Sequence, residues 1–587
     1  MSIMCKRKIY GKLLGWKALA AAAFLAGSAQ AAKIDIASGT TCALAAAQSS
    51  EASAGARKYV MCGWDLKWIT PQDVLRNAEK FRDAAFDGLT FHVAATNSFG
   101  EAMMYPAREE RWERKAVEPF VEPMRRVLEM DPFRDSFLFG FSSPSRRLAW
   151  TDDAGWTRIA TNMAVLGWYA GACGIKGIHC DLEDYYKVRQ YFRCPGDPPA
   201  AELKALVRRR AAQVFGALLR EQPEARLLFL WILNDEPGYM NCADPAGMAD
   251  ALGDLTPAFF DGILDVMPET ARLINGDENC YFADYTSRSY HKSYINNFNV
   301  CPKFLSPENR AKYLRLSQVS FGFYSDMLVH PEGHGYYLAP INGCRAEHFR
   351  RNLRDATELA TEYVWIWGER HPLVDWEDAR IETRVSGKGT WDEVVPGFYE
   401  AMRCCKDLDR GLDRRLRDLA RKGLLKDLCT NPSCSSREGS DAIPAPFETW
   451  CSPKEKDGRF FVDRSAGCGD GSCLAMEGVR KGCIFLTLKD LPPGGTYAIT
   501  FACRGNVRSE VNYRNHGAWV RSQERYLIVP GTAGADGWRR AKALVVLPEG
   551  VDTLSLTFGD ALREGAGIRV DDVHVHPIDF TAEEFAK

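Results

Sequence analysis

The feature that most constrains the fold is an alternation of short apolar runs with longer amphipathic stretches, which continues from residue 58 to residue 408. Apolar runs of about four to eight residues are typical of strands buried on both faces. Stretches with an apolar period near 3.6 predict helices. The runs predict eight strands, at residues 59–64, 88–93, 136–141, 175–182, 226–233, 262–267, 318–324 and 363–367.

Eight strands that alternate with helices predict an α/β fold of the (β/α)8 TIM-barrel type with long loops after the strands. A doubly wound open sheet is the alternative, and it would carry a glycine-rich phosphate turn after the first strand. Cys62-Gly-Trp-Asp-Leu-Lys has no G-x-G-x-x-G pattern, which favours the barrel. Helices are predicted at residues 71–84, 111–130, 153–172, 202–221, 256–260, 346–362 and 396–408, with a partly helical crossover at 283–316.

Beyond residue 440 the apolar period changes to two, which is typical of half-buried strands. Turns rich in proline and glycine separate these strands, so an all-β jelly-roll-like sandwich domain is predicted. The chain would then contain a barrel at 58–408, predicted to be the catalytic domain, a charged linker at 409–440 and the sandwich at 441–587. The sandwich strands are predicted at residues 484–488, 496–503, 518–529, 539–547, 553–558 and 568–575.

The N-terminus resembles a secretory signal peptide. A lysine- and arginine-rich start precedes an apolar run at residues 18–26, which is too short to span a bilayer. Ala29-Gln30-Ala31 is a cleavage pattern, so residues 1–31 are predicted to be removed near Ala31. An Ala-, Ser- and Thr-rich flexible leader would follow at 32–57. The sequence therefore predicts a secreted or periplasmic protein, with no transmembrane segment.

The charge balance argues against nucleic acid as a partner. The 587 residues contain 75 Lys and Arg against 77 Asp and Glu, a net charge of −2. A protein that binds nucleic acid or an anionic membrane by charge needs a basic field, and this composition shows none. The sequence does not indicate an oligomeric state.

The chain contains 19 cysteines, and removal of Cys5 with the signal would leave an even number. An even number in an exported chain predicts disulfides. The spacings lack paired C-x2-C knuckles and neighbouring histidines, so neither a metal ion nor another cofactor is expected. Cys62 and Cys180 lie within apolar strands and are predicted to be buried thiols. The candidate bridges are Cys429–Cys434, Cys468–Cys473, Cys280–Cys301 and Cys194–Cys242.

The fourth predicted strand ends in a pair of carboxylates, Asp181 and Glu183. Because side chains alternate along a strand, both lie on the face that also carries His179. At this spacing one carboxylate raises the pKa of the other, so one is suited to be an acid while the other stays charged. Solvated acids at a strand end are the simpler alternative.

Similar residues follow most of the other strands. In a (β/α)8 barrel the active site lies at the carboxyl ends of the strands, so these residues are predicted to meet. Apart from Asp181 and Glu183, the predicted substrate-binding residues are Trp64, Asp65, His92, Asp184, Tyr185, Trp231, Asn234, Asp235, Glu236, Glu269, Tyr324, Asp326, Trp365, Trp367 and Glu369.

Carboxylates and aromatic rings together favour carbohydrate chemistry. Aromatic faces stack on sugar rings, and carboxylates bind hydroxyls and catalyse glycosyl transfer. A phosphate-binding barrel would carry glycines and basic residues after the last strands. A metal hydrolase would carry a His-x-His pattern on the first strand. Each of these residues also has a simpler interpretation when it is taken alone. Trp365 and Trp367 fit core filling equally well, and His92 fits a hydrogen-bonded core residue. Glu269 fits a solvated loop residue, and residues 234–238 fit a polar turn.

The fourth strand resembles the DGxDxDxE motif of family 18 chitinases. Lys176-Gly-Ile-His-Cys-Asp-Leu-Glu183 matches its glycine, its last aspartate and its glutamate, while Lys176 and His179 replace its first two aspartates. The resemblance implies a general acid at Glu183 and, at Asp181, a residue that orients the substrate's acetamido group. Trp365-Ile-Trp367 resembles the tryptophan at the floor of such sites.

The C-terminal sandwich resembles carbohydrate-binding modules. Gly537-Trp-Arg-Arg and Gly567-Ile-Arg-Val-Asp-Asp-Val-His-Val are similar to the final strands of such modules. The combined hypothesis is an exported glycoside hydrolase that acts on a polysaccharide or glycan. Glu183 would be the general acid/base, and Asp181 would be either the nucleophile or the residue that orients a substrate-derived one. A catalytically inactive glycan-binding protein and a structural envelope protein are the alternatives.

Overall fold

The computed structural model describes most of the chain beyond residue 56. The predicted signal peptide, the predicted leader and the candidate residues Asn234, Asp235 and Glu236 lie outside the described residues. Among the described residues, no helix has the length and apolarity that crossing a membrane requires. The described residues are 57–67, 69–93, 95, 103, 105–107, 111–233, 243–285, 288–376, 385–454, 458–469, 471–515, 518–519, 526–548 and 550–585.

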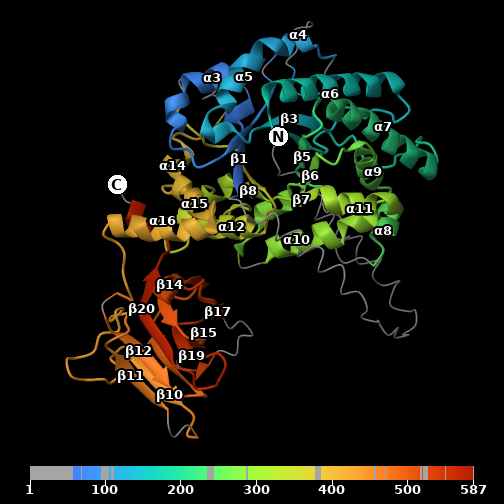
Figure 1. The fold of residues 1–587 in the computed structure, drawn as a ribbon. Coiled ribbons are helices and arrows are strands. Elements are labelled where there is room, and N and C mark those ends of the chain that lie inside the picture. The colour runs from blue at the N-terminus through green and yellow to red at the C-terminus, as the bar shows by residue number, and fades with distance from the viewer. Residues whose placement is uncertain are drawn as a thin grey trace, which may run out of the picture. The chain divides into compact units, whose positions relative to one another are not determined.

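The first part of the chain forms a nine-stranded parallel sheet in the order β7-β6-β5-β4-β3-β2-β1-β9-β8 (Figure 1). The strands are nearly continuous apolar runs, as expected where both faces are covered. They are β1 (Lys58–Gly63), β2 (Gly88–Phe91), β3 (Phe137–Ser142), β4 (Gly177–Asp181), β5 (Arg226–Phe229), β6 (Arg272–Asn275), β7 (Ser317–Val319), β8 (Gly322–Tyr324) and β9 (Tyr363–Gly368).

The two terminal strands of this sheet are neighbours in sequence. β7 pairs with β6 at one end, β8 pairs with β9 at the other, and only Ser320 and Phe321 separate them along the chain. The Ser320 N–H donates to the Asn275 carbonyl at 2.7 Å, and the Trp365 N–H donates to the Phe321 carbonyl at 3.1 Å. The connecting residues therefore bond to both β6 and β9.

Helices cover the outside of this sheet, and α6, α7 and α9 pack side by side (Figure 1). The two caps of α6 fix where this helix begins and ends, and so where the chain leaves it for β4. Asp152 accepts a hydrogen bond from the Gly155 N–H, and Gly174 ends the helix with a φ of 88°. The helices are α3 (Pro71–Arg76), α4 (Arg114–Val117), α5 (Val121–Leu128), α6 (Asp153–Cys173), α7 (Ala200–Glu221), α8 (Pro245–Leu252), α9 (Thr256–Val266), α10 (Ser289–Asn299), α11 (Pro307–Leu316), α12 (Arg345–Leu359), α14 (Trp391–Val394), α15 (Phe398–Cys405) and α16 (Leu408–Arg421).

The predicted sixth strand at 262–267 was wrong. That segment belongs to α9, and the strand is β6, which begins at Arg272. Phe259, Phe260, Ile263 and Leu264 are buried at helical spacing, whereas a short apolar run by itself fits a strand equally well. The shift matters because the residues that follow the sixth strand are not the predicted ones.

The last part of the chain forms two antiparallel sheets, as the period of two indicated. Strands β10, β11, β12 and β15 had no sequence prediction. In β15 every second residue is buried, and Ser509 is one of them because its hydroxyl donates to the Ile528 carbonyl. One sheet contains β10 (Phe447–Cys451), β13 (Gly482–Leu488), β19 (Thr553–Asp560), β15 (Val507–Asn515), β16 (Ala518–Trp519) and β17 (Tyr526–Ile528), and the other β11 (Arg459–Asp463), β12 (Cys473–Glu477), β20 (Ile568–Pro577), β14 (Thr496–Arg504) and β18 (Arg539–Val546).

The chain after β20 returns to the helices around the parallel sheet. Phe580 is fully buried in the same hydrophobic core as the parallel strands. The Arg415 guanidinium on α16 lies over the Phe580 ring at 4.3 Å and donates to the Ile578 carbonyl at 2.9 Å. Arg415 also forms a two-point ion pair with Glu584. This segment, residues 578–585, is termed the C-terminal tail below.

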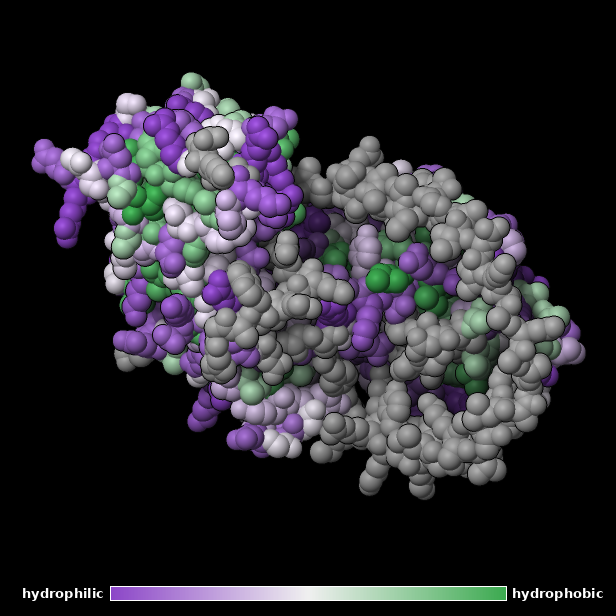
Figure 2. Space-filling view, turned by 90° about the horizontal axis from the view of Figure 1, so that it is seen from below, coloured by the Kyte–Doolittle hydropathy of each residue, from purple (hydrophilic) through white to green (hydrophobic). Residues whose placement is uncertain are grey.

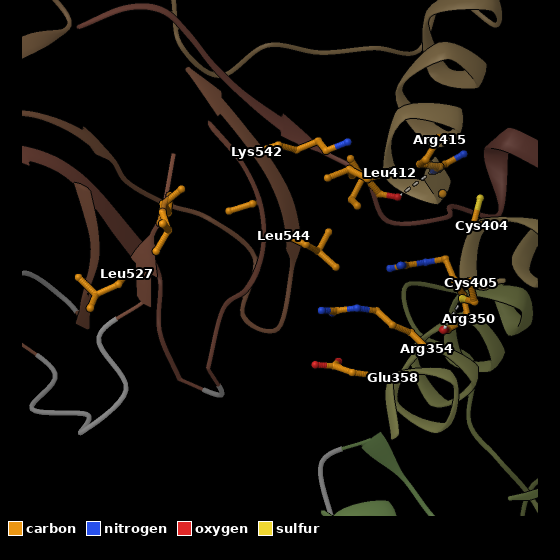
Figure 3. Close-up of a pocket in the computed structure, with 15 residues that line it drawn as sticks. Arg350, Arg354, Glu358, Cys404, Cys405, Leu412, Arg415, Leu527, Lys542 and Leu544 are labelled. Carbon is orange, nitrogen blue, oxygen red and sulfur yellow. Dashed lines mark hydrogen bonds between the residues drawn. The ribbon is translucent and has the colours of Figure 1, made fainter. Parts of the chain in front are cut away.

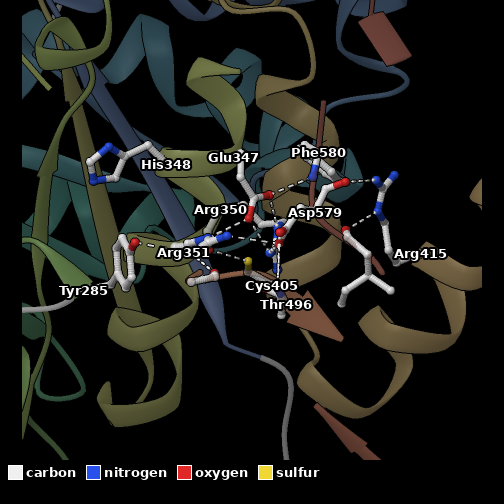
Figure 4. A network of polar contacts seen from close by, with 12 residues as sticks. Tyr285, Glu347, His348, Arg350, Arg351, Cys405, Arg415, Thr496, Asp579 and Phe580 are labelled. Carbon is white, nitrogen blue, oxygen red and sulfur yellow. Dashed lines mark hydrogen bonds and ion pairs between the residues drawn. The ribbon is translucent and has the colours of Figure 1, made fainter. Parts of the chain in front are cut away.

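A buried ionic network joins α12 to the C-terminal tail (Figure 4). Glu347 is fully buried and accepts hydrogen bonds from Arg350, from Arg351 and from the Phe580 N–H at 2.7–2.9 Å. Burial alone would raise the pKa of Glu347, but the two guanidinium groups lower it to about 2. Burial and the charge of Glu347 raise the pKa of Asp579 to about 6.

The predicted disulfides do not form in the described part of the chain. All described cysteines are free thiols, including Cys62 and Cys180, which are buried as predicted. The proposed partner Cys242 lies outside the described residues. Sequence spacing sets neither the distance between two Cα atoms nor the direction of their side chains, and a disulfide requires both to fit. The bridges ruled out here are Cys429–Cys434, Cys468–Cys473 and Cys280–Cys301.

Candidate active site

The end of β4 holds the carboxylate pair in a defined geometry. Asp181 is buried, and its two oxygens accept hydrogen bonds from the Glu183 N–H and the Tyr185 hydroxyl, both at 2.7 Å. The Tyr185 ring is 52% exposed, but its hydroxyl is turned inward. Burial of that hydroxyl, with the charges of Asp181 and Glu183, raises the pKa of Tyr185 far above its ordinary value. Glu183 itself is half-buried, so its carboxyl group lies at the boundary with solvent.

A second carboxylate pair lies at the ends of β8 and β9. The two oxygens of Glu369 accept hydrogen bonds from the Tyr324 hydroxyl at 3.1 Å and from the Trp367 indole N–H at 3.2 Å. The Glu369 N–H donates to Asp326 at 2.7 Å. Asp326 is fully buried, and burial together with the charge of Glu369 raises the pKa of Asp326 to about 7.

Tyr281 lies beside the carboxylate pair at the ends of β8 and β9. It lies in the 3-10 turn Glu278–Phe282 that follows β6, and its ring stacks on Tyr324, the residue that donates to Glu369, with centroids 5.5 Å apart. The Tyr281 ring also packs against Trp365 with centroids 5.2 Å apart, and Trp365 packs against His179 on β4 at 5.2 Å. These ring contacts link the turn after β6 to β4, β8 and β9. Burial raises the pKa of Tyr281 well above its ordinary value.

Glu278 and Tyr281 were not among the predicted site residues. The sequence carries a signal for them, because Asn275-Gly-Asp-Glu278 is a polar turn directly after an apolar run. Placing the sixth strand ten residues too early concealed that turn. Gly276 is required there, since a Cβ atom would lie 2.6 Å from the Phe229 carbonyl oxygen.

The aromatic candidates differ in their access to solvent. Trp64 is 36% exposed and packs edge-on against Trp367 at 6.1 Å, so both lie beside Glu369. Trp365 is fully buried, and its indole N–H donates to the Gly276 carbonyl at 2.7 Å. Trp231 is also buried. The exposed rings are suited to contact a ligand, whereas Trp365 holds the turn after β6.

Three other predicted residues form contacts within the protein. Asp65 is buried, and it accepts hydrogen bonds from the Leu373 N–H and the Trp376 indole N–H, which hold the loop after β9. Burial raises the pKa of Asp65 to about 6. His92 stacks on Phe139 at 4.8 Å. Asp184 accepts two backbone N–H groups within its own turn, from residues 188 and 189.

Glu269 lies away from the other acids. It precedes β6, at the amino end of that strand, and forms an exposed ion pair with Arg315 at 2.9 Å. The parallel strands place the carboxyl ends of β4, β8 and β9 at the opposite edge of the sheet from this residue. The structure therefore separates Glu269 from Glu183 and Glu369.

A mapped cavity of about 360 Å³ lies elsewhere, between helices α12, α15 and α16 and strands β17 and β18 (Figure 3). Arg354, Glu358 and Lys542 line it together with Cys404 and Cys405. Neither Glu183 nor Glu369 lines this cavity.

On the face drawn in Figure 2, hydrophilic side chains predominate among the coloured residues, and hydrophobic ones form small groups.

Comparisons with known proteins assign no family. No family model and no curated protein matches the chain. Among solved structures, a CBM22-1–GH10 fragment of Clostridium thermocellum endo-1,4-β-D-xylanase 10B is 12% identical over 22% of this chain and 26% of that chain, with a TM-score of 0.19. The CBM22-1–CBM22-2 tandem of Paenibacillus barcinonensis Xyn10C is 12% identical over 26% and 49%, with a TM-score of 0.20. A Stig cyclase from Fischerella sp. TAU is 10% identical over 26% and 100%, with a TM-score of 0.21.

This chain thus spans about a quarter and about a half of the two xylanase chains. At such TM-scores the likeness supports neither an activity nor a substrate.

Proposed function

We propose that this protein is a glycoside hydrolase whose active site lies at the carboxyl ends of β4, β6, β8 and β9. The observation that carries the proposal is that Tyr281 stacks on Tyr324, the residue that donates to Glu369, at the edge of the sheet where β4 also ends with Asp181 and Glu183. Glycoside hydrolysis requires two carboxyl groups on either side of one bond, supplied here by different strands. The adjoining ends of β7 and β8 support a closed (β/α)8 barrel, the fold in which the active site lies at the carboxyl ends of the strands.

Each carboxylate has a distinct role in this proposal. Glu183 is the general acid/base, because it is half-buried and borders solvent. Glu369 is the second carboxylate, oriented by Tyr324 and Trp367. Asp181 positions Glu183, since its Oδ1 accepts the Glu183 N–H at 2.7 Å. In this proposal Asp181 is the orienting residue and not the nucleophile.

The exposed aromatic rings supply the sugar contacts. Trp64 and Tyr185 lie at the ends of β1 and β4, and Trp367, at the end of β9, lies beside Trp64. Rings that are half exposed at a cluster of acids are suited to stack on pyranose faces. The substrate class is therefore a polysaccharide or glycan, and the two antiparallel sheets would act as its binding module.

The test is a screen of the purified protein against a panel of plant, microbial and animal polysaccharides, with release of reducing ends as the readout. The proposal predicts hydrolysis of at least one class, and NMR of the first product then gives the anomeric outcome. Binding of a glycan without release of reducing ends would support the inactive glycan-binding protein instead. Failure to bind or cleave any panel member would contradict both.

Export is proposed on the pattern of residues 1–31. Mass spectrometry of the protein isolated from its own cells is expected to show a mature chain that begins at Ala32. An intact N-terminus would contradict it.

A further inference from the structure

A cluster of two histidines and an aspartate lies away from the strand ends, on β20. One ligand atom from each of Asp427, His574 and His576 lies within 4.8 Å of the others. His574 and His576 are two residues apart on the same face of the strand, and their rings stack with centroids 5.4 Å apart. Asp427 comes from the segment between α16 and β10, so the cluster joins chain segments about 150 residues apart.

The contacts of His576 define which of its nitrogens carries the proton. Its Nδ1 lies 2.8 Å from the Lys426 carbonyl oxygen. A carbonyl oxygen only accepts hydrogen bonds, so Nδ1 must be protonated. In the neutral ring, Nε2 then has a free lone pair. Ring nitrogens prepared in this way by a backbone carbonyl are typical of metal-binding histidines.

Asp427 is held rigidly toward His574. Its Oδ1 accepts the N–H groups of Cys429 at 2.9 Å and of Val575 at 3.1 Å. Its Oδ2 lies 2.6 Å from His574 Nδ1. The backbone bonds fix the carboxylate in place, so it is positioned before any ligand binds.

The other nitrogen of His574 faces a second carboxylate. His574 Nε2 lies 2.9 Å from Asp572 Oδ1. Asp572 has a φ of 52° and lies where the register of β20 shifts against β14, which identifies a β-bulge. A bulge redirects side chains, and a non-glycine residue in the left-handed region costs free energy that needs a reason. Here the bulge directs Asp572 to His574.

We propose that Asp427 Oδ2, His574 Nδ1 and His576 Nε2 bind one divalent transition-metal ion, with zinc as the preferred ion. Two imidazoles and one carboxylate are a donor set that suits zinc. Both histidines already have the outer partners of metal ligands, namely the Asp572 carboxylate and the Lys426 carbonyl. The fourth ligand is a water molecule, because His574 and Asp427 are partly exposed.

Zinc binding changes the contacts of His574 at one nitrogen only. The ion takes the place of the hydrogen between Nδ1 and Asp427, which leaves to solvent as a proton, while Nε2–H still donates to Asp572. Zinc bonds of about 2.0–2.1 Å keep tetrahedral ligands about 3.4 Å apart. The ligand atoms of Asp427 and His574, which lie 2.6 Å apart, must therefore separate, and the His576 ring must move closer to them.

The proposed ion would fasten the segment at 426–429 to β20. That segment follows α16, so the site secures the chain where it enters the antiparallel sheets. The cysteine spacings predicted no metal ion, and the ligands proposed here are two histidines and an aspartate that lie far apart in the sequence.

The experiment titrates chelator-treated full-length protein with Co²⁺ and with Zn²⁺. Co²⁺ spectra separate nitrogen and oxygen ligands from cysteine thiolates, which matters in a chain with many free thiols. The proposal predicts one ion per chain without a thiolate charge-transfer band. Zn²⁺ is expected to raise Tm.

His576→Gln is the test variant, because it removes one ligand and leaves the His574–Asp427 ion pair intact. Its affinity is expected to fall at least tenfold. His291→Gln, at an exposed position on α10, is the control and should bind as the wild type does. Unchanged affinity in His576→Gln, a thiolate band, or no binding at all would overturn the proposal and leave only an ion pair at His574.

Discussion

Asp326 and Glu369 show how two neighbouring acids are held differently at the strand ends. Glu369 accepts side-chain hydrogen bonds on both oxygens, from Tyr324 and Trp367. Asp326 is fully buried and receives the Glu369 N–H, with the Arg370 guanidinium 3.8 Å away. Burial dominates, so the pKa of Asp326 rises to about 7. A buried carboxyl group that takes up a proton near neutral pH makes stability depend on pH.

The sign follows from proton binding. Between about pH 4 and pH 7 the folded protein binds a proton at Asp326 that the unfolded chain does not bind, so this residue lowers stability as the pH rises. Asp326→Asn removes the titration and keeps an oxygen for the Glu369 N–H. We predict that the difference in free energy of unfolding, Asp326→Asn minus wild type, increases by about 2 kcal/mol from pH 5 to pH 8.

Urea unfolding at both pH values measures this difference. Glu269→Gln is the control, because Glu269 is exposed and its change should add no comparable trend. A difference for Asp326→Asn that stays constant or decreases with pH would contradict the raised pKa.

Local patterns predicted acids at the strand ends and did not identify those that are occupied elsewhere. Asp181, Glu183 and Glu369 follow apolar runs, and their parallel strands end at the same edge of the sheet. Asp65 also follows such a run, but its partners Leu373 and Trp376 are about 310 residues away in sequence, where no local pattern shows them. Side-chain roles of this kind depend on long-range hydrogen bonds.

At the scale of elements, the C-terminal tail is the clearest departure from the expected organisation. A terminal segment beyond the last strand was predicted to belong to the sandwich. Phe580 instead lies in the core beneath the parallel sheet and contacts Arg350 and Arg415. The burial of Phe580 depends on its packing against α12 and α16, which carry these two arginines.

Phe580→Ala is expected to lower the free energy of unfolding by about 3–5 kcal/mol, because it leaves a cavity in a closed core. Leu562→Ala is the matched control at a 55% exposed position, and its effect should stay within about 0.5 kcal/mol. Denaturant titration of both variants gives the comparison. A loss at Phe580 as small as that at Leu562 would show that the tail does not dock in solution.

Element boundaries were predicted well where a cap or a long period marks them. The predicted helix at 153–172 corresponds to α6 (Asp153–Cys173), with its aspartate cap and terminal glycine. The error at β6 arose because a short stretch such as 262–267, with four apolar residues in six, fits part of a helix or one strand. Only packing against α7 decides for the helix.

At the scale of the molecule, two hydrophobic cores are joined by the ionic network at Glu347. One core lies around the parallel sheet and the other between the two antiparallel sheets. Arg351 connects both, because it pairs with Glu347 and donates to the Gly494 carbonyl at 2.6 Å. These contacts predict that the two parts unfold together.

Calorimetry of the wild type should therefore show one transition. Glu347→Gln removes the carboxylate that two buried guanidinium groups share and leaves them with Asp579 alone. Breaking a buried ion pair costs up to about 3–5 kcal/mol, and the substitution is expected to separate the transition into two. Arg76→Gln, at a largely exposed side chain on α3, is the control and should retain one. Two well-separated transitions in the wild type would contradict the coupling.

The central claim is that the acids at the carboxyl ends of the strands perform catalysis. The most direct test compares two matched glutamate-to-glutamine variants on the glycan that the wild type cleaves. Glu183→Gln changes the proposed acid/base, and Glu269→Gln changes an exposed glutamate at the amino end of β6. Loss of a general acid typically costs a factor of about 10²–10⁴ in rate. We predict that the kcat of Glu183→Gln falls by this factor while glycan binding is retained, and that the kcat of Glu269→Gln stays within about twofold of wild type. Equal activity of the two variants would contradict a catalytic role for Glu183.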